Sequence, residues 1–313
     1  SKRQVYEAMM RSVREILSQK KFGYEQELKK RRVKRAYYMS MEFLVGRTLR
    51  NNLFNLGIEQ EIKTYLSKHH ISLDEIYQIE PDPGLGNGGL GRLASCYLDA
   101  LTSQDYPVTG FSILYEYGIF KQVINNGWQQ EFPDYWLELG KYGLVYRNDE
   151  EVEVRFGGEL EQVMTETGLK VNHKNYTSIQ AEPYDLLISG YDSSAVNTLR
   201  LWEAKAKTGF NMKLFERGEY SKSSEAEAIA SSISKLLYPA DVTNEGKELR
   251  IKQQYFFISA SLQQLVKNHY NEFGTLENLS EHVALHINDT HPAMAVAEFM
   301  RLLIDEYHYS WEK

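Results

Sequence analysis

Cysteine and proline are scarce in this sequence, and long apolar runs are missing. Cys96 is the only cysteine among 313 residues, which excludes a disulfide framework and cysteine-rich metal sites and favours a reducing cytosol. No hydrophobic stretch approaches the roughly 20 residues that a membrane span requires. With seven prolines and no Pro-, Gly- or Ser-rich linker, a single domain over residues 1–313 is expected. The sequence therefore predicts a cytoplasmic protein with no membrane partner.

The remaining composition is that of an ordinary globular protein, with 42% hydrophobic and 25% charged residues. The net charge of −7 hides an asymmetry, because residues 1–50 carry 14 basic and 5 acidic side chains. The basic run 29–35 could bind an anionic partner, such as nucleic acid or a phosphorylated effector. A solvated loop before a strand is the simpler interpretation, since the rest of the chain is acidic. Nucleic acid is therefore not an expected partner.

Hydrophobic periodicity predicts an α/β fold. Helical patterns cover residues 5–17, 47–78, 92–104, 223–237 and 248–269. Strand patterns cover residues 35–40, 184–190 and 283–287. The last of these strands is expected to be buried, and with the turn and helix that follow it forms the clearest parallel α/β unit. In the helix 92–104, one face is expected to carry Leu93, Tyr97, Leu98 and Leu101.

Residues 106–164 have a β-rich pattern. Segments 152–156 and 160–163 alternate on either side of Gly157-Gly158, which predicts that they pair as an antiparallel hairpin. Farther along, the helix 223–237 carries only a thin apolar stripe, so it is expected to project or to lie at an interface.

The first candidate for chemistry is the glycine loop 84–91, which precedes a helix. Five glycines in eight residues leave the backbone open to a ligand, and helix-start N–H groups attract phosphate. The loop contains G-x-G-x-x-G twice, but it follows Pro81-Asp82-Pro83 rather than a strand, which argues against dinucleotide binding. Phosphate or sugar-phosphate binding is favoured over a purely structural helix start.

The second candidate is Asp289-Thr290-His291 at the carboxyl end of a strand, where open α/β sheets bind ligands. These side chains could hydrogen-bond sugar hydroxyls or take part in proton transfer. Alternatively, Asp289 or Thr290 caps the next helix and Pro292 occupies its first turn. No metal site is expected, because no ligand set accompanies His286 and His291.

A third candidate is the loop that enters the long helix near residue 248. Asp241 or Thr243 could cap that helix, and the loop could also gate a site. From the residues alone, capping is favoured.

These stretches resemble motifs of the glycogen, starch and maltodextrin phosphorylase family. The similar segments are Tyr37–Arg47, Gly84–Arg92, Tyr115–Phe120, Asn197–Trp202, Leu237–Pro239, Glu245–Arg250 and Asn288–Pro292. They follow the family's order and spacing across nearly the whole chain. The chain therefore resembles the N-terminal domain of this family.

The resemblance implies a glycosyltransferase-B architecture, of which this chain is the N-terminal Rossmann-like domain with a β-rich insertion and a long helical region. Members carry pyridoxal 5'-phosphate on a lysine of the C-terminal domain. They use inorganic phosphate to release glucose 1-phosphate from α-1,4-glucans such as glycogen, starch or maltodextrin. The helix 223–237 corresponds to one that packs across the family's homodimer interface.

The family pattern also assigns residues. His291 and Asp289 line the catalytic cleft. Gly88 and Gly89 direct their N–H groups toward the phosphates of cofactor and substrate, with Leu90 beside the glucose.

The resemblance implies supporting roles for a second group of residues. Asn87 and Arg92 support the loop, Glu42 orients nearby groups, Asp241 lies on a gate over the site, and Thr290 adjoins the substrate.

The resemblance also implies what these 313 residues lack. The cofactor lysine, the basic phosphate-binding residues and the second domain are expected outside them, so the chain alone is expected to be inactive. Lys267-Asn268 replace an arginine pair that binds nucleotide effectors in animal members, so AMP activation is not expected.

Two other functions are considered. The chain could be a non-catalytic carbohydrate-binding domain. A nucleotide-sugar glucan synthase of the same architecture is disfavoured, because its lysine-led glycine loop near the N-terminus does not occur here.

Overall fold

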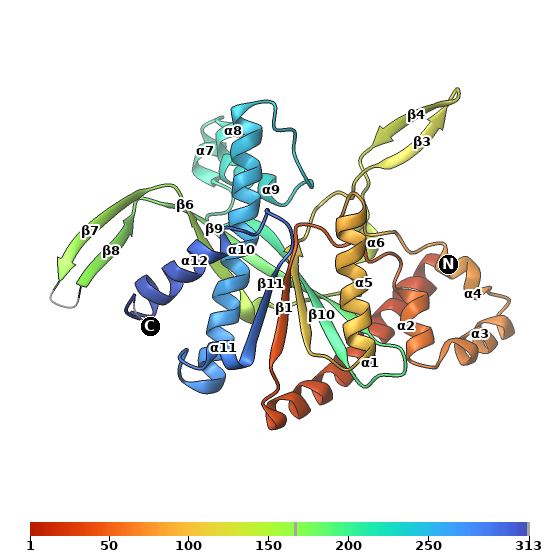
Figure 1. The fold of residues 1–313 in the computed structure, drawn as a ribbon. Helices are drawn as coiled ribbons and strands as arrows, with labels where there is room; N and C mark the ends of the chain where they lie inside the picture. The colour runs from red at the N-terminus through yellow and green to blue at the C-terminus, as the bar shows by residue number, and fades with distance from the viewer. Residues whose placement is uncertain (166–167, 312–313) are drawn as a thin grey trace.

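The fold is of the mixed α/β class, with long helices covering a central β-sheet (Figure 1). A computed structural model describes residues 1–165 and 168–311. The central sheet consists of β1 (Arg35–Met39), β2 (Val108–Ile113), β5 (Leu144–Tyr146), β6 (Val152–Phe156), β9 (Thr177–Ser189), β10 (Val196–Ala206) and β11 (Val283–Ile287). Its order is β11-β1-β2-β10-β9-β5, with β6 also pairing with β9. The α/β class expected from the sequence is confirmed.

Strand direction divides the sheet into two parts. β11, β1, β2 and β10 are parallel, so their carboxyl ends lie at one edge. β9 runs antiparallel to β10 and also pairs antiparallel with β5 and β6. The parallel part therefore provides the edge at which a ligand site is expected.

The long helices lie on opposite faces of the parallel strands. They are α1 (Lys2–Arg31), α5 (Gly89–Ser103) and α10 (Asn244–Phe273). Tyr37 faces a cavity between α1 and α10, whereas the next residue, Tyr38, contacts Tyr97 of α5. Since successive side chains alternate across a strand, α5 covers the face opposite to α1 and α10.

Shorter helices fill the rest of the fold. They are α2 (Leu49–Asn55), α3 (Glu59–Lys68), α4 (Leu73–Tyr77), α6 (Leu137–Gly140), α7 (Met212–Glu216), α8 (Tyr220–Ser223), α9 (Glu225–Ile233), α11 (Leu279–His282) and α12 (Ala295–Arg301). Single turns are η1 (Lys141–Gly143), η2 (Asn148–Glu150) and the π-turn η3 (Leu302–Glu306). A separate apolar cluster joins α2, α3 and α4 to the N-terminal half of α1.

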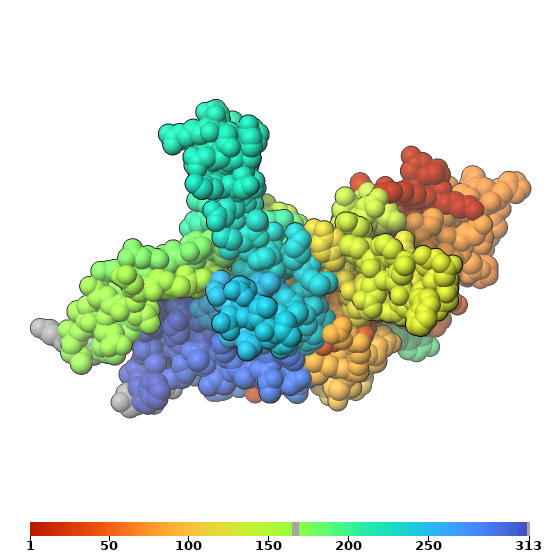
Figure 2. All heavy atoms as spheres, turned by 90° about the horizontal axis from the view of Figure 1, so that it is seen from above, coloured from red at the N-terminus to blue at the C-terminus, as the bar shows by residue number. Residues whose placement is uncertain are grey.

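Three segments stand away from the body when the two views are taken together (Figure 1 and Figure 2). Two are hairpins, β3 (Lys121–Asn125) with β4 (Trp128–Phe132) and β7 (Glu159–Thr165) with β8 (Gly168–Lys174). The third contains α7 and α8, which precede the stretch 223–237 expected to project, whereas Ala230 and Ile233 of α9 within that stretch are buried in the core.

The hairpin expected between residues 152–156 and 160–163 is wrong. β6 pairs with β9, and β7 pairs with β8. Gly157 and Gly158 both have positive φ, and a Cβ at Gly158 would lie 2.4 Å from the carbonyl oxygen of Lys174. The two glycines therefore turn the chain out of the main sheet, and alternation alone could not reveal the partners.

Two expectations about local structure fail in part or in full. The basic run 29–35 is only partly a loop before a strand, because Lys29, Lys30 and Arg31 form the last turn of α1, where positive charge complements the helix dipole, and residues 32–34 connect it to β1. Strand β11 is not buried, because it is an edge strand whose side chains alternate between half-buried and exposed.

The predicted inward face of α5 is only partly correct. Leu98 is 2% exposed, but Leu93 and Tyr97 are 47% and 48% exposed. Small side chains, Ala94 and Ser95, instead face the sheet, which lets the helix approach closely.

Trp202 provides a test of the core. It is fully buried on β10, and its Nε1 donates to Ser261 Oγ of α10 at 2.9 Å. Trp202→Ala is expected to lower the free energy of unfolding by about 3–5 kcal/mol, since it leaves a large cavity. Denaturant unfolding measures this, with Trp128→Ala on the exposed hairpin as control. Equal losses in the two variants would contradict the assignment of Trp202 to the core.

Candidate functional site

The carboxyl ends of β1 and β11 meet through a short hydrogen-bonded chain. Asn288 donates its backbone N–H to Met39 O at 3.0 Å and its Nδ2 to Ser40 Oγ at 3.1 Å. The same hydroxyl accepts the backbone N–H of Glu42 at 3.2 Å. These bonds bring Glu42 close to the segment 289–291, although the two lie far apart in the sequence.

Glu42 also holds the glycine loop. Its side chain is 4% exposed, and its Oε2 accepts the backbone N–H of Asn87 at 2.7 Å. Phe43 and Leu44 extend the junction, since their N–H groups donate to Leu85 O and Gly91 O. A buried carboxylate is stable only with hydrogen-bond donors around it, so this contact fixes the loop against the sheet.

The loop glycines fall into two groups. A Cβ at Gly86 would lie 2.8 Å from Leu44 Cγ, and one at Gly91 would lie 2.9 Å from Glu42 Cβ. In contrast, a Cβ at Gly88 or Gly89 would meet no atom of the described chain within 4 Å. Gly86 and Gly91 therefore permit close packing on Glu42, whereas Gly88 and Gly89 leave exposed backbone at the start of α5.

The start of α5 is open to an anion. Gly88 is its N-cap, and among the described residues no side chain accepts a hydrogen bond from the first turn. That turn also contains no acidic residue. Unpaired N–H groups and the positive end of the helix dipole favour a negative ligand here. Leu90 is half-buried beside them, and Arg92 donates to Leu44 O at 3.1 Å.

The segment after β11 has a strained conformation. Asp289 has φ 67°, and its Oδ1 accepts the backbone N–H of Thr290 at 2.6 Å. His291 is mostly buried, and its Nδ1 lies 3.8 Å from Asp289 Oδ2. Left-handed backbone at a residue with a side chain is typical of binding sites. The capping alternative is wrong, because α12 begins only at Ala295.

Tyr238 begins the third candidate segment, but the sequence assigned it no role at the site. Its ring lies 5.2 Å from the His291 ring, and the Glu42 carboxylate acts on its hydroxyl. Burial, and then the Glu42 contact, raises the pKa of Tyr238 far above its usual range, so the hydroxyl stays protonated. The motif Leu237-Tyr238-Pro239 was the available signal, but it gave no indication of the partners.

Asp241 lies at the margin of this cluster. Its side chain is 58% exposed and pairs with Arg250, whose guanidinium lies 5.3 Å from the Tyr238 ring centre. Asp241 does not cap the helix. Thr243 is the N-cap of α10 and accepts the Gly246 N–H at 3.2 Å.

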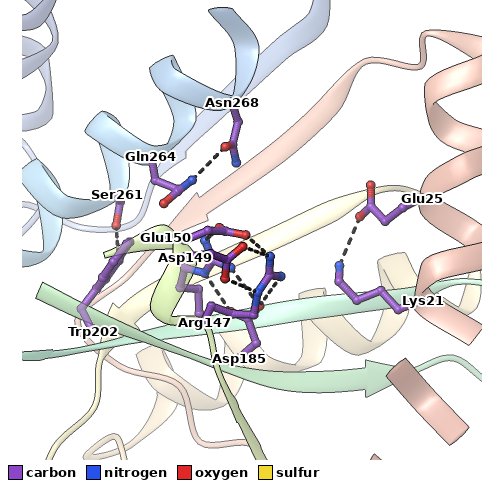
Figure 3. A network of polar contacts seen from close by, with 11 residues as sticks. Lys21, Glu25, Arg147, Asp149, Glu150, Asp185, Trp202, Ser261, Gln264 and Asn268 are labelled. Carbon is purple, nitrogen blue, oxygen red and sulfur yellow. Dashed lines mark hydrogen bonds and ion pairs between the residues drawn. The ribbon is translucent and has the colours of Figure 1, made fainter. Parts of the chain in front are cut away.

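A cavity of about 900 Å³ lies on the other side of the sheet, between α1 and α10 (Figure 3). Arg200 pairs with Asp185 and Glu150, Arg147 pairs with Asp149 and Glu150, and Lys21 pairs with Glu25. Because these cations are neutralised within the chain, the cavity is less suited to an anionic substrate than the uncapped start of α5.

Two further properties concern residues 1–165 and 168–311. They contain no cluster of three or more histidine, cysteine, aspartate or glutamate side chains able to hold a metal ion. In the same ranges, no helix is both long and apolar enough to cross a membrane.

The arrangement defines an α/β protein with a candidate anion and sugar site at the carboxyl edge of its parallel strands. The family described as carbohydrate phosphorylase matches residues 66–313, most of the chain. The chain belongs to this family.

Individual relatives agree with this membership. Glycogen phosphorylase of Haemophilus influenzae is 41% identical over 313 residues, which is all of this chain and 38% of the relative. Glycogen phosphorylases of Bacillus subtilis and Synechocystis sp. are 42% and 44% identical, over 98% and 88% of this chain. They are covered over 38% and 33% of their own lengths, so the chain spans a little over a third of these relatives.

The two groups of loop glycines predict losses of stability of different size. Gly91→Ala is expected to destabilise the fold by about 1–3 kcal/mol, because its methyl group overpacks against Glu42. Gly88→Ala should cost less than about 1 kcal/mol, since the methyl group points into open space. Urea unfolding of both variants measures the difference. A larger loss for Gly88→Ala would show that the division of the loop is incorrect.

Proposed function

We propose that this chain forms part of an α-1,4-glucan phosphorylase that uses pyridoxal phosphate and inorganic phosphate to release glucose 1-phosphate. The observation that carries the proposal is the uncapped start of α5, which hydrogen bonds through Glu42 and Ser40 join to the segment that holds Asp289 and His291 at the edge of the parallel strands. Family membership supports it.

The proposed reaction transfers a glucosyl group to phosphate. An oxygen of inorganic phosphate bonds to C1 of the terminal glucose, the α-1,4 bond breaks, and a proton passes to the departing O4. When bound, pyridoxal phosphate would supply a phosphate group as the proton partner of the attacking phosphate. The exposed N–H groups at Gly88 and Gly89 fit a phosphate group, because no Cβ screens them.

The remaining side chains are assigned to the sugar and to support. Asp289, Thr290 and His291 would hydrogen-bond glucose hydroxyls, and Leu90 would pack beside the sugar ring. Glu42 would keep the loop and its N–H groups in place through Asn87. Asp241, exposed and paired with Arg250, would be carried on a loop that covers the site.

The wider architecture is part of the same proposal. We infer a glycosyltransferase-B arrangement in which the parallel strands form one Rossmann-like half. We also infer a cytoplasmic homodimer that uses the stretch 223–237, as the family resemblance implies; the projecting helices α7 and α8 directly precede this stretch (Figure 2). The more cautious alternative is a domain that binds carbohydrate without turnover.

Gly89→Val tests the phosphate assignment in the whole protein. The side chain would project from the start of α5 without touching the described chain, so stability should be kept. Because it would block the N–H groups, kcat/KM for phosphate is expected to fall about a hundredfold. Gly23→Val, on the exposed face of α1, is the matched control. Equal kinetics in the two variants would rule out phosphate binding at the loop.

The chain of 313 residues provides a second test. Since it spans little over a third of its relatives, it is expected to release no glucose 1-phosphate from maltodextrin with added phosphate and pyridoxal phosphate, whereas the whole protein does. Enzymatic detection of glucose 1-phosphate measures this. If neither protein has activity but both bind maltodextrin, the carbohydrate-binding alternative is favoured.

A further inference from the structure

Tyr238 has an unfavourable backbone conformation at the point where the two halves of the site meet. Its φ is 51°, in the left-handed region, although its side chain is bulky and Pro239 follows. This region disfavours any residue with a Cβ, and a following proline restricts the backbone further. Asp289, whose charge acts on Tyr238, shares the feature with φ 67°. Two strained residues thus lie in one cluster.

The surrounding chain imposes this conformation. Leu237, just before Tyr238, is buried in the main core. Gln253 of α10 is 1% exposed, and its Nε2 donates to Ile233 O at 3.0 Å and to Leu236 O at 2.8 Å. The backbone leading to Tyr238 is therefore anchored to a core helix, which can hold the side chain in one position.

The ring of Tyr238 constrains His291. The two ring centres are 5.2 Å apart at an interplanar angle of 31°. His291 Nδ1 is buried, and no hydrogen-bond partner for it lies within residues 1–165 and 168–311. A functional imidazole is usually oriented by a hydrogen bond from one ring nitrogen. Here that bond is missing and Asp289 Oδ2 lies 3.8 Å from Nδ1, so packing against Tyr238 adds a constraint on the plane of the ring.

The hydroxyl of Tyr238 acts on the other half of the site. It interacts electrostatically with the Glu42 carboxylate, which in turn accepts the Asn87 N–H at 2.7 Å. Glu42 is almost fully buried, so the loss of one polar partner would leave it poorly satisfied. The position of the glycine loop therefore depends on this hydroxyl.

We propose that Tyr238 is a positioning residue that orients His291 through its ring and the glycine loop through its hydroxyl. The kinetic consequences rest on the proposed phosphorolysis. The mechanical link between the two segments does not, and hydrogen exchange can measure it without turnover.

Tyr238→Phe removes the hydroxyl and keeps the ring. In the whole protein, backbone amides of segment 84–91 are expected to exchange about tenfold faster, because Glu42 holds Asn87 less firmly. Exchange in segment 288–292 should stay unchanged. The KM for phosphate should rise about tenfold while kcat stays within about threefold, since the loop is displaced but His291 is still oriented.

Tyr238→Leu removes the ring as well. Exchange is then expected to rise in both segments, and kcat should fall at least about tenfold in addition to the change in KM. Tyr191→Phe, an exposed tyrosine that stacks on Phe54, is the matched control and should change none of these quantities. Hydrogen exchange by mass spectrometry and initial-rate kinetics provide the readouts.

The outcomes distinguish a failure of the positioning role of Tyr238 from a failure of the proposed phosphorolysis. Unchanged exchange in segment 84–91 in Tyr238→Phe would overturn the role of the hydroxyl, and unchanged exchange in segment 288–292 in Tyr238→Leu would overturn that of the ring. If the wild-type protein has no phosphorolytic activity, the proposed function fails, but the exchange results still decide the positioning role. If Tyr238→Leu does not fold, Tyr238→Phe remains a sufficient test of the hydroxyl.

Discussion

The buried carboxylate of Glu42 is the constraint on which the site depends. A charged group that is 4% exposed must be surrounded by polar partners, and here the partners come from separate parts of the chain. The Asn87 N–H that donates to Glu42 belongs to the glycine loop, and the Tyr238 hydroxyl on which Glu42 acts belongs to the stretch before α10. The need to solvate one carboxylate thus joins these segments to the end of β1.

This constraint explains why the loop contains so many glycines. Gly86 and Gly91 lie against Glu42 and Leu44, where a Cβ has no room. Gly88 and Gly89 have no such neighbour, so packing does not require glycine there, and their lack of side chains would instead serve the proposed phosphate binding. The contacts separate the glycines that packing requires from those that the proposed function requires.

The parallel direction of four strands explains why the segments of the candidate site meet at one edge of the sheet. Because β1, β2, β10 and β11 are parallel, the loops after β1 and β11 leave the sheet at the same edge. The bond between Asn288 and Ser40 joins residues 248 positions apart. The strained backbone at Asp289 and Tyr238 persists because the neighbouring core over-determines it.

The sequence by itself determined the α/β class, the family, the strand predicted at 35–40, which is β1, and the residues of the glycine loop and of the segment 288–292. These are read from local periodicity and from motifs whose members are adjacent in the chain. Only the tertiary structure decided that β7 pairs with β8, that Leu93 and Tyr97 face outward, and that Tyr238 joins Glu42 to His291. Those features depend on which distant surfaces meet, and a local pattern carries no information about its partner.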